Sequence, residues 1–370
     1  MTELERFLAV VRFEKPDYWP LINVSGLGYV HQGGLLKLHR EGMPESVNDL
    51  ESWLRYWGQC GFEDVGGLGR GAPGVKQESW VEGEFEYIRS ETGALTRQVV
   101  DNNLAYSMPE FVEFDVRDRA SWERYRELQT PLKKGDVEEQ AERLDGRTRP
   151  ARVAAGSTWG TVRNWMGPER ALLAIYDDPD LVREMIEWQT WMFDEFTAPV
   201  IERYRPEVVS MWEDFCYNHG MLLSPETFRE LCAPHYRRVA EVASECGAEL
   251  LIVDSDGKVD EYCLLLEEMD FNGCWPMEQV CGNDLRDYRK RQPRFIFAGG
   301  IEKEIANTGN GYLIEGELLP RVAELLEIGG FLPMFDHALQ TGVGFEELCH
   351  CMTLLHRICG SEHLGEFPRG

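Results

Sequence analysis

The groups in this chain that most suggest chemistry are two aspartates at the end of an apolar run. Residues 250–258 read LLIVDSDGK, so Asp254 and Asp256 stand one residue apart. On an extended segment two such side chains share a face, and their charges repel each other unless a cation or a shared proton lies between them. The pair therefore predicts either a metal site or a pair of groups that transfer protons.

Polar residues follow the other short apolar runs in the same way. They are Ser157 and Thr158, Glu213 and Asp214 with Asn218 and His219 close behind, Glu278, Gly299 and Gly300, and Asp336 and His337. The carboxyl ends of parallel strands lie at one edge of a sheet, so these residues are expected to converge there. A lone aspartate after a strand is ordinarily a helix cap or turn former, and that interpretation stays open for Asp214 and Asp336.

The elements that must position these groups are apolar runs alternating with helical segments. Strands are predicted at 151–157, 207–212, 249–254, 271–276, 294–300 and 330–335, and helices at 180–203, 225–245, 259–268, 318–328 and 345–358. This alternation predicts a parallel sheet covered by helices. Six such units, with one or two more from the N-terminal part, favour a closed (β/α)8 TIM barrel over an open sheet. No G-x-G-x-x-G sequence stands between a strand and a helix, which argues against a dinucleotide-binding fold.

We interpret residues 1–370 as a single barrel domain. Residues 1–148 are predicted to supply N-terminal helices, loops, a hairpin and the first barrel units, and residues 149–370 the regular βα units. Within 80–100, two β-favouring stretches are separated by SETGA, which predicts the hairpin. The charge-rich segment 115–145 is expected to form one or two solvated helices.

Residues 26–75 are rich in glycine and are predicted to form long loops around short elements. We expect these loops to form a wall over the barrel mouth. Tyr29, His31 and Arg70 are the residues within them that are the first candidates for facing a substrate.

Composition limits the classes of function. The chain has 370 residues, with 65 acidic against 38 basic side chains and a formal net charge of −27. Such a field repels phosphate backbones and anionic lipids, so nucleic acid and membrane surfaces are excluded as partners. No run approaches the roughly 18 consecutive apolar residues that span a bilayer. Ten irregularly spaced cysteines indicate reduced thiols, and we expect a cytoplasmic protein.

The last predicted helix carries several residues of types that bind metals. They are Cys349, His350, Cys351, His356 and Cys359. The cysteines recur with leucine and methionine at helical spacing, which is typical of a packing face. We therefore expect this cluster to be part of the core and not a metal site.

Four segments of the chain resemble the uroporphyrinogen decarboxylase superfamily. They read RFLAVVRFEKPDYWP, MWEDFCYNHGMLLSPETFRELCAPHYRRV, CWPMEQVCGNDLRDYRKRQPRFIFAGGIEKEIA and GGFLPMFDHALQTGV. The resemblance implies a (β/α)8 barrel and one of two activities. One is the cofactor-free decarboxylation of uroporphyrinogen acetates, and the other is methyl transfer that involves a corrinoid protein and a zinc ion. The resemblance is also compatible with a homodimer.

Departures from the family pattern favour methyl transfer. Decarboxylases carry an arginine-rich segment after the first strand, which residues 22–42 lack, and an octa-anionic substrate would be repelled by a mouth rich in carboxylates. The zinc methyltransferases place His-x-Cys after the fifth strand and a cysteine after the eighth. Here Asp254-x-Asp256 takes the first place, and Asp336 with His337 takes the second. Such ligands bind zinc less softly than thiolates and also suit other divalent ions.

We therefore expect a methyltransferase that takes the methyl group of a small methylated compound, for example a methoxyaromatic, and passes it to a corrinoid protein. The expected ligands of a divalent metal, with zinc the first choice, are Asp254, Asp256 and His337. The candidate catalytic residues are Glu213, Asp214, His219 and Glu278, and the candidate cofactor contacts are Gly299 and Gly300. Two alternatives remain open: a cofactor-free decarboxylase in which Asp254 or Asp256 protonates a carbanion, and a non-catalytic binding protein on the same barrel.

Overall fold

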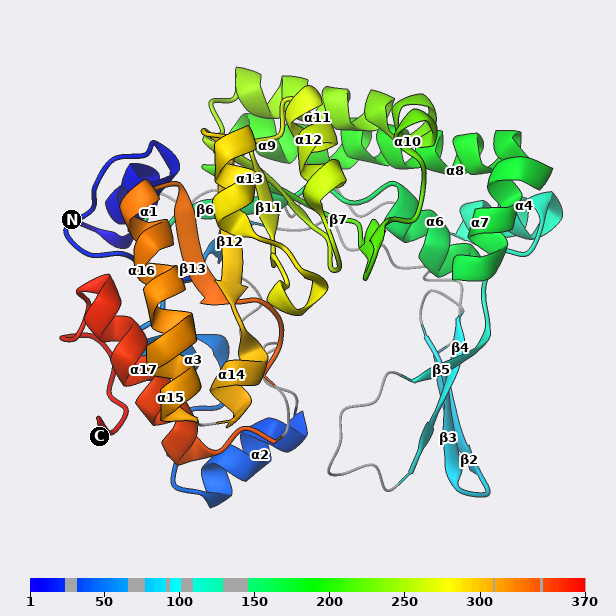
Figure 1. Ribbon diagram of the computed structural model, residues 1–370. Coiled ribbons are helices and arrows are strands. Elements are labelled where there is room, and N and C mark those ends of the chain that lie inside the picture. The colour runs from blue at the N-terminus through cyan, green and yellow to red at the C-terminus, as the bar shows by residue number, and fades with distance from the viewer. Residues whose placement is uncertain are drawn as a thin grey trace.

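A curled sheet of seven parallel strands forms the centre of the protein (Figure 1). The computed structural model describes residues 1–23, 32–65, 77–90, 94–100, 109–128, 146–308, 310–339 and 342–369. The strands, in their order across the sheet, are β1 (Glu63–Asp64), β6 (Ala151–Ala154), β7 (Val208–Trp212), β10 (Leu250–Asp254), β11 (Gly273–Trp275), β12 (Ile296–Ile301) and β13 (Phe331–Phe335). All six strands predicted from the sequence are therefore present, and their order along the chain is their order in the sheet.

The predicted closed eight-stranded barrel is confirmed only in part. Between the two outer strands lies a segment in which Ile22 forms a single parallel bridge with Cys60. The Ile22 amide donates to the Pro333 carbonyl of β13 at 3.0 Å, and the Cys60 amide donates to the Leu21 carbonyl at 2.8 Å. Pro20 has no amide to extend this pairing. Among the described residues the segment does not form an eighth strand, and the seven strands alone do not close a barrel.

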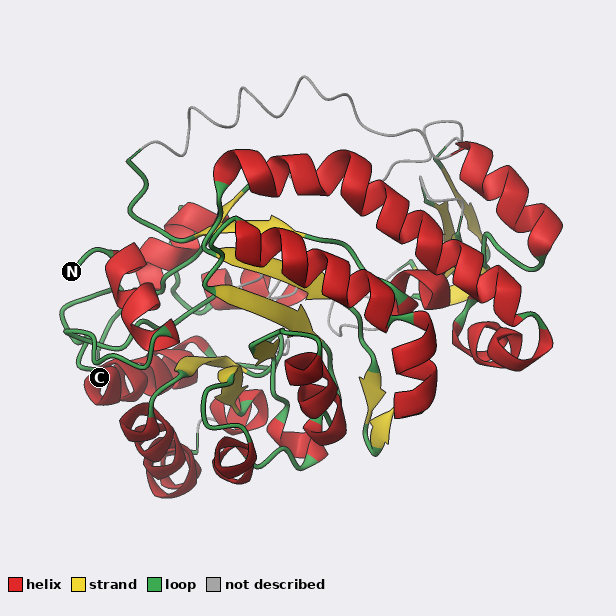
Figure 2. Ribbon diagram, turned by 90° about the horizontal axis from the view of Figure 1, so that it is seen from above, coloured by secondary structure: helices red, strands yellow, loops and turns green. Residues whose placement is uncertain are grey.

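Helices follow the strands and cover the outside of the sheet (Figure 2). At the predicted places lie α8 (Pro179–Met192), η3 (Phe193–Thr197), α9 (Ala198–Tyr204), α10 (Pro225–Leu231), α11 (Ala233–Glu245), α12 (Asp260–Glu268), α16 (Leu319–Ile328) and α17 (Phe345–Cys359). The sequence did not predict α6 (Trp159–Met166), α7 (Pro168–Asp177), η4 (Gln279–Cys281), α13 (Leu285–Arg291), α14 (Lys303–Thr308), α15 (Gly311–Leu313) or η5 (Ile314–Leu318). The expected helix 225–245 is two helices because Pro234 cannot continue the hydrogen bonding of the first.

Two apolar layers hold the sheet in place. The larger layer packs the outer face of the strands against the helices. The smaller one fills the inside of the curl with alternate strand residues, among them Val208, Ile252 and Leu332. Phe7 and Val10 of α1 (Glu3–Val11) belong to this inner layer, so α1 closes the end of the sheet from which the strands start. The opposite end, where the strands finish, is the end that carries the polar residues.

The described part of the first 148 residues contains three further helices and a second sheet. The helices are α2 (Gln32–Arg40) and α3 (Leu50–Trp57), and the sheet is β2 (Glu78–Glu82), β3 (Phe85–Arg89), β4 (Leu95–Val99) and β5 (Glu110–Glu113), followed by α4 (Arg119–Leu128). The predicted hairpin is confirmed as β3 and β4, and it belongs to an antiparallel sheet in the order β2-β3-β4-β5, which we call the arm. Tyr29, His31 and Arg70 lie outside the described residues, as does most of the predicted helical segment after α4.

No helix among the described residues is both long enough and apolar enough to cross a bilayer. In α17, Cys351 and Cys359 are buried, as the helical spacing predicted, and Cys349 is buried too. The His356 ring nitrogens contact the Ser361 hydroxyl at 2.7 Å and the Trp57 carbonyl at 2.8 Å. This helix is therefore joined to the core by packing and by hydrogen bonds to α3 and the C-terminal segment.

Gly299 and Gly300 near the end of β12 serve a close backbone contact. Their φ angles are +115° and +70°, and a Cβ on Gly299 would lie 1.6 Å from the Pro276 carbonyl oxygen. The Gly300 amide donates to that same oxygen at 3.1 Å. Glycine is required here by the approach of the loop that follows β11, so the expected role of these residues as cofactor contacts has no support from their surroundings.

Replacing Gly299 by alanine tests this contact. We expect Gly299→Ala to lower the free energy of unfolding by about 3 kcal/mol, because the new Cβ overlaps backbone atoms and φ is positive. Gly316 is the matched control, since it is helical, exposed and has no atom within 4 Å of a built Cβ. Gly316→Ala should leave the midpoint of urea unfolding the same or slightly higher. Equal midpoints for the two variants would contradict the assignment.

Candidate functional site

Four carboxylates and a histidine meet where the central strands end. Asp214, Asp254 and Asp256 each offer an oxygen, and these atoms lie within 4.8 Å of one another. Asp256, Glu278 and His337 form a second such group, so Asp256 belongs to both. We call these five residues the carboxylate cluster. The sequence placed them after β7, β10, β11 and β13, and the parallel sheet brings those strand ends to one edge.

Asp214 is turned toward the cluster by its backbone. Its φ is +45°, a left-handed value that few residues other than glycine adopt. The amides of Glu213 and Asp214 both donate to the Asp254 carbonyl, at 2.9 and 3.3 Å. Arg163 of α6 donates to the Asp214 carboxylate at 2.9 Å and to its carbonyl at 3.1 Å. Burial raises the pKa of Asp214, and repulsion by Asp256 adds to this shift.

Glu213 does not lie in the cluster, contrary to its predicted place. Its side chain is fully buried on the other side of the strand end. The carboxylate accepts hydrogen bonds from the amides of Thr158 and Gly160 at 2.6 and 2.8 Å, and from the Thr158 hydroxyl at 2.7 Å. These donors begin α6, where a negative charge is stabilised by the exposed amides and the helix dipole. Glu213 is thus an anchor for α6. The outward direction of Glu213 could have been predicted from the alternation of side chains along a strand, since Trp212 faces inward and the next residue faces outward.

Asp254 ends β10 on the inner face of the sheet. In register it lies between Trp212 of β7 and Trp275 of β11. Burial raises the pKa of Asp254 well above its usual range, and the charges of Asp256 and Asp214 raise it further. Either a proton or a cation placed beside it therefore stabilises this buried carboxyl group.

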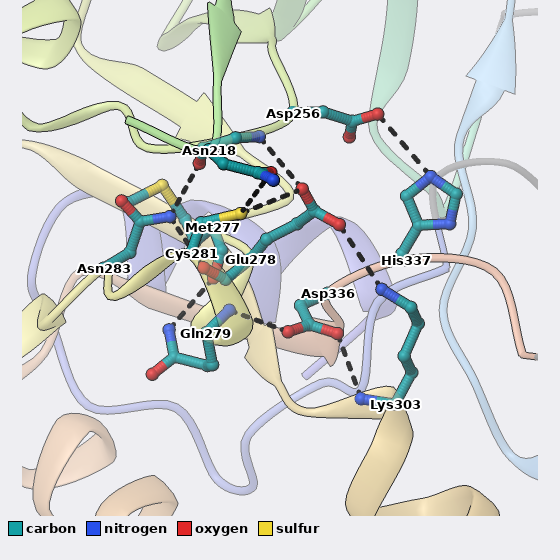
Figure 3. A network of polar contacts seen from close by, with 11 residues as sticks. Asn218, Asp256, Met277, Glu278, Gln279, Cys281, Asn283, Lys303, Asp336 and His337 are labelled. Atoms are coloured by element: carbon teal, nitrogen blue, oxygen red, sulfur yellow. Dashed lines mark hydrogen bonds and ion pairs between the residues drawn. The ribbon is translucent and has the colours of Figure 1, made fainter. Parts of the chain in front are cut away.

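Asp256 and His337 face each other from different strands. The His337 Nε2 atom is 3.6 Å from an Asp256 carboxylate oxygen, and both side chains are partly exposed (Figure 3). Contact with Asp256 raises the pKa of His337, although burial opposes this shift. The His337 Nδ1 atom is buried and has no hydrogen-bond partner among the described residues. Among the described residues, Nδ1 therefore makes no hydrogen bond, and Nε2 faces only the carboxylate of Asp256.

Glu278 is held on the opposite side of Asp256. Its carboxylate accepts from the Gly257 amide at 2.9 Å and lies 3.3 Å from the ammonium group of Lys303 (Figure 3). Lys303 begins α14 and is nearly buried. The Cys281 thiol contacts the same carboxylate at 3.7 Å, and burial followed by the charge of Glu278 raises the pKa of Cys281 to about 11. The sulfur next to the cluster is therefore a thiol at neutral pH, not a thiolate.

Asp336 and His219 have other surroundings than the cluster. Asp336 is buried, and its carboxylate accepts from the amides of Gln279 at 2.9 Å and Lys303 at 3.0 Å. Burial raises the pKa of Asp336 to about 6. This residue ties together the loops after β11, β12 and β13. His219 is exposed in the turn between β8 (Cys216–Tyr217) and β9 (Gly220–Met221), and it belongs to neither group of the cluster.

Three cationic side chains near these residues were not predicted from the sequence. Arg163 pairs with Asp214, and Lys303 pairs with Glu278. Arg152 of β6 lies inside the curl, where it pairs with Asp64 at 2.6 Å and covers the ring of Trp275 at 5.6 Å. Arg152 lies within a strand and Arg163 within a helix, so the search of strand ends missed them, whereas Lys303 follows β12 by two residues and was overlooked. Asp214 and Glu278 thus have a fixed cation, whereas Asp254 has no ion pair among the described residues and Asp256 has only His337.

This balance defines what the site can do. Two neighbouring carboxylates, Asp254 and Asp256, hold charge that no fixed cation neutralises, and a histidine stands beside them. Oxygen and imidazole ligands bind zinc and harder divalent ions. Without a metal, Asp254 is the group best placed to hold a proton and act as an acid, because burial raises its pKa.

Comparisons with known proteins give a likeness in fold. No family model matches the chain, and a search of curated proteins finds no relative. Among solved structures, the chain is similar to a methyltransferase from Methanosarcina mazei, with a TM-score of 0.56 and 12% sequence identity. The match covers 97% of this chain and 98% of that one. At this identity the likeness concerns the fold, and it extends over both the curled sheet and the N-terminal part.

Removing the Glu213 carboxylate tests its role as an anchor. Glu213→Ala leaves buried amide donors unsatisfied and opens a cavity, so we expect it to lower the free energy of unfolding by about 3 kcal/mol or more. Glu230→Ala is the control, because that exposed glutamate pairs with Arg183 at the surface and should change stability by less than about 1 kcal/mol. Chemical denaturation measures both. A stable Glu213→Ala protein would contradict the anchor.

The titration of His337 tests the contact with Asp256. We expect the wild-type ring to stay protonated to a higher pH than free histidine, because contact with Asp256 is the main cause of the raised pKa. The stability that this pairing contributes is present below pH about 6.5 and is lost as pH rises through the folded-state pKa. Asp256→Asn should lower the His337 pKa, as measured by NMR. Lys303→Met should raise it, because the Lys303 charge opposes protonation.

Proposed function

We propose that the protein is a methyltransferase that takes the methyl group of a small methoxy compound and passes it to a corrinoid carried by a partner protein. The observation that supports this proposal most directly is the carboxylate cluster at the strand ends, with two carboxylates that lack a fixed cation. The fold likeness to a methyltransferase adds support, since it covers nearly the whole of both chains.

The metal ligands that we propose are Asp254, Asp256 and His337, with zinc as the first choice. Asp214 and Glu278 are less suited, because Arg163 and Lys303 already neutralise them. The histidine fits a metal because its buried Nδ1 has no partner among the described residues. Carboxylate and imidazole ligands fit a Lewis-acidic site that binds oxygen.

The chemistry divides between the bound groups and the side chains. A metal held by these ligands supplies Lewis acidity at the methoxy oxygen, and the corrinoid supplies the nucleophile that accepts the methyl group. When the methyl group leaves, the oxygen keeps the electron pair of the broken bond and must take up a proton. Asp214 is the proposed donor, because burial and the charge of Asp256 raise its pKa by more than Arg163 lowers it, while Arg163 fixes its position. His219 is exposed outside the cluster, so we do not propose it for this step.

A decarboxylase is the second candidate. The observation that favours it is the place of Asp254 between Trp212 and Trp275, where burial raises its pKa, because a carboxyl group that holds its proton to a higher pH can protonate a carbanion after loss of carbon dioxide. This reaction needs no metal. The two candidates therefore differ in what the same aspartates hold, a cation or a proton.

Metal binding separates the two candidates. We expect the wild-type protein to bind about one zinc ion, and Asp254→Asn and His337→Gln each to weaken binding at least about 100-fold, since each removes a ligand. Calorimetric titration of metal-free protein with zinc measures this. Glu230→Gln, on the exposed end of α10, is the control and should bind like the wild type.

Activity completes the test. The wild-type protein with zinc should release the free hydroxyl compound from a methoxyaromatic in the presence of reduced cobalamin, and the two ligand variants should not. Release of carbon dioxide from a carboxylic substrate by metal-free protein would instead establish the decarboxylase.

A further inference from the structure

The arm exposes an apolar surface that nothing in the described chain covers. Its main contacts are those of its own four strands with one another. Large apolar side chains remain exposed on both of its faces: Trp80 and Val99 on one, Val81 and Phe111 on the other, and Val100 and Val112 as well. A sheet of this size is stable when one face packs against another surface, and exposed apolar patches in soluble proteins mark interaction sites.

Strand register brings three aromatic residues to one face of the arm, whereas Phe111, which pairs with Thr96, lies on the other face. Trp80 pairs with Tyr87 across β2 and β3, and the two rings stack at 5.3 Å with an angle of 4°. Phe85 pairs with Val99 on the same face, and the Arg97 guanidinium lies 4.8 Å above the Phe85 ring. We call Trp80, Tyr87, Phe85 and Val99 the aromatic face. Rigid aromatic residues of this kind supply most of the binding energy in many protein interfaces.

The charge of the arm is negative. Its described strands and turns carry six glutamates, Glu78, Glu82, Glu84, Glu86, Glu110 and Glu113, against two arginines, Arg89 and Arg97. Both arginines already pair with glutamates, at 3.4 Å to Glu113 and 2.7 Å to Glu110. A second copy of this chain, with a net charge of −27, is repelled by such a surface. A partner with an apolar patch bordered by lysine and arginine is attracted to it.

The arm is joined to the element that serves the site. After β5, the ring of Phe114 packs against Gly167, and the Val116 amide donates to the Trp165 carbonyl at 2.9 Å. Both contacts are at the end of α6, the helix that carries Arg163 and is anchored by Glu213. In Figure 1 the arm projects in the direction in which the arrow of β13 points, which is the end of the sheet that holds the carboxylate cluster.

We infer that the aromatic face of the arm is the docking surface for the protein that carries the methyl acceptor. The inference rests on the proposed function, and it names the chemistry of the partner: an apolar patch with basic residues around it. Docking beside the strand ends places the carrier where its reactive group can approach the cluster. The arm's acidic border then sets partner choice and association rate, while its aromatic rings supply affinity.

The test compares a protein acceptor with a small one. Each corrinoid-binding protein of the source organism is purified and titrated against the wild type, Trp80→Ser with Tyr87→Ser, and Glu82→Lys with Glu84→Lys. The second double variant reverses the charge at the end of β2 and in the turn that follows, where Glu82 pairs with Phe85, and it replaces none of the four residues of the aromatic face. Tyr312→Ser, an exposed aromatic of α15 outside the arm, is the control. Methyl transfer to free reduced cobalamin is measured for all four proteins.

We expect one carrier to bind the wild type and the Tyr312→Ser protein alike, and both arm variants to bind it at least about tenfold more weakly. Transfer to free cobalamin should be the same in all four. If the arm variants bind the carrier with unchanged affinity, the docking surface is wrong and the proposed function stands. The same conclusion follows if the wild type binds none of the carriers but methylates free cobalamin. A carrier that binds through the arm while neither acceptor is methylated retains the docking surface and refutes the proposed function.

Discussion

The repulsion among carboxylates at the strand ends is the constraint on which the rest of this structure depends. The sheet brings Asp214, Asp254 and Asp256 within 4.8 Å of one another, and partly buried charges at such distances destabilise a fold unless they are compensated. Arg163 and Lys303 provide that compensation at the two sides of the cluster. At the centre, Asp254 and Asp256 keep negative charge that a bound cation or a proton can compensate.

Two other buried carboxylates, Glu213 and Asp336, fix the loops that carry the cluster. Glu213 accepts backbone amides at the start of α6, and Asp336 accepts the amides of Gln279 and Lys303. Each joins loops that are far apart in the sequence. Because Asp214 follows Glu213 directly, anchoring one carboxylate outside the strand fixes the left-handed turn that aims the next one inward. The position of Arg163 on the same helix completes this arrangement.

Much of this could be predicted from the sequence. All six strands and the convergence of Asp254, Asp256, Glu278 and His337 follow from apolar runs with polar ends, because parallel strands end at one edge. The places of Glu213 and the glycines could not be read in this way. A strand-end list does not say to which face a side chain turns, nor that Pro276 approaches Gly299 from another loop. Among the described residues, the place of an eighth strand is taken by Leu21, Ile22 and Asn23, which make single hydrogen bonds to Cys60 and Pro333 beside the sheet edges.

The state of the sulfur atoms bears on what kind of chemistry the cluster serves. Burial raises the pKa of Cys216 and Cys281, two cysteines on the loops around the cluster, so both remain thiols at neutral pH. A soft metal site needs thiolates, which form where cations or amides lower the pKa of a cysteine. Arg163 and Lys303 are bound to carboxylates instead, and the effect of Lys303 in lowering the pKa of Cys281 is outweighed by burial and by Glu278. The electrostatics of the strand ends are thus arranged around oxygen and protons, which suits a reaction whose leaving group is an oxygen atom.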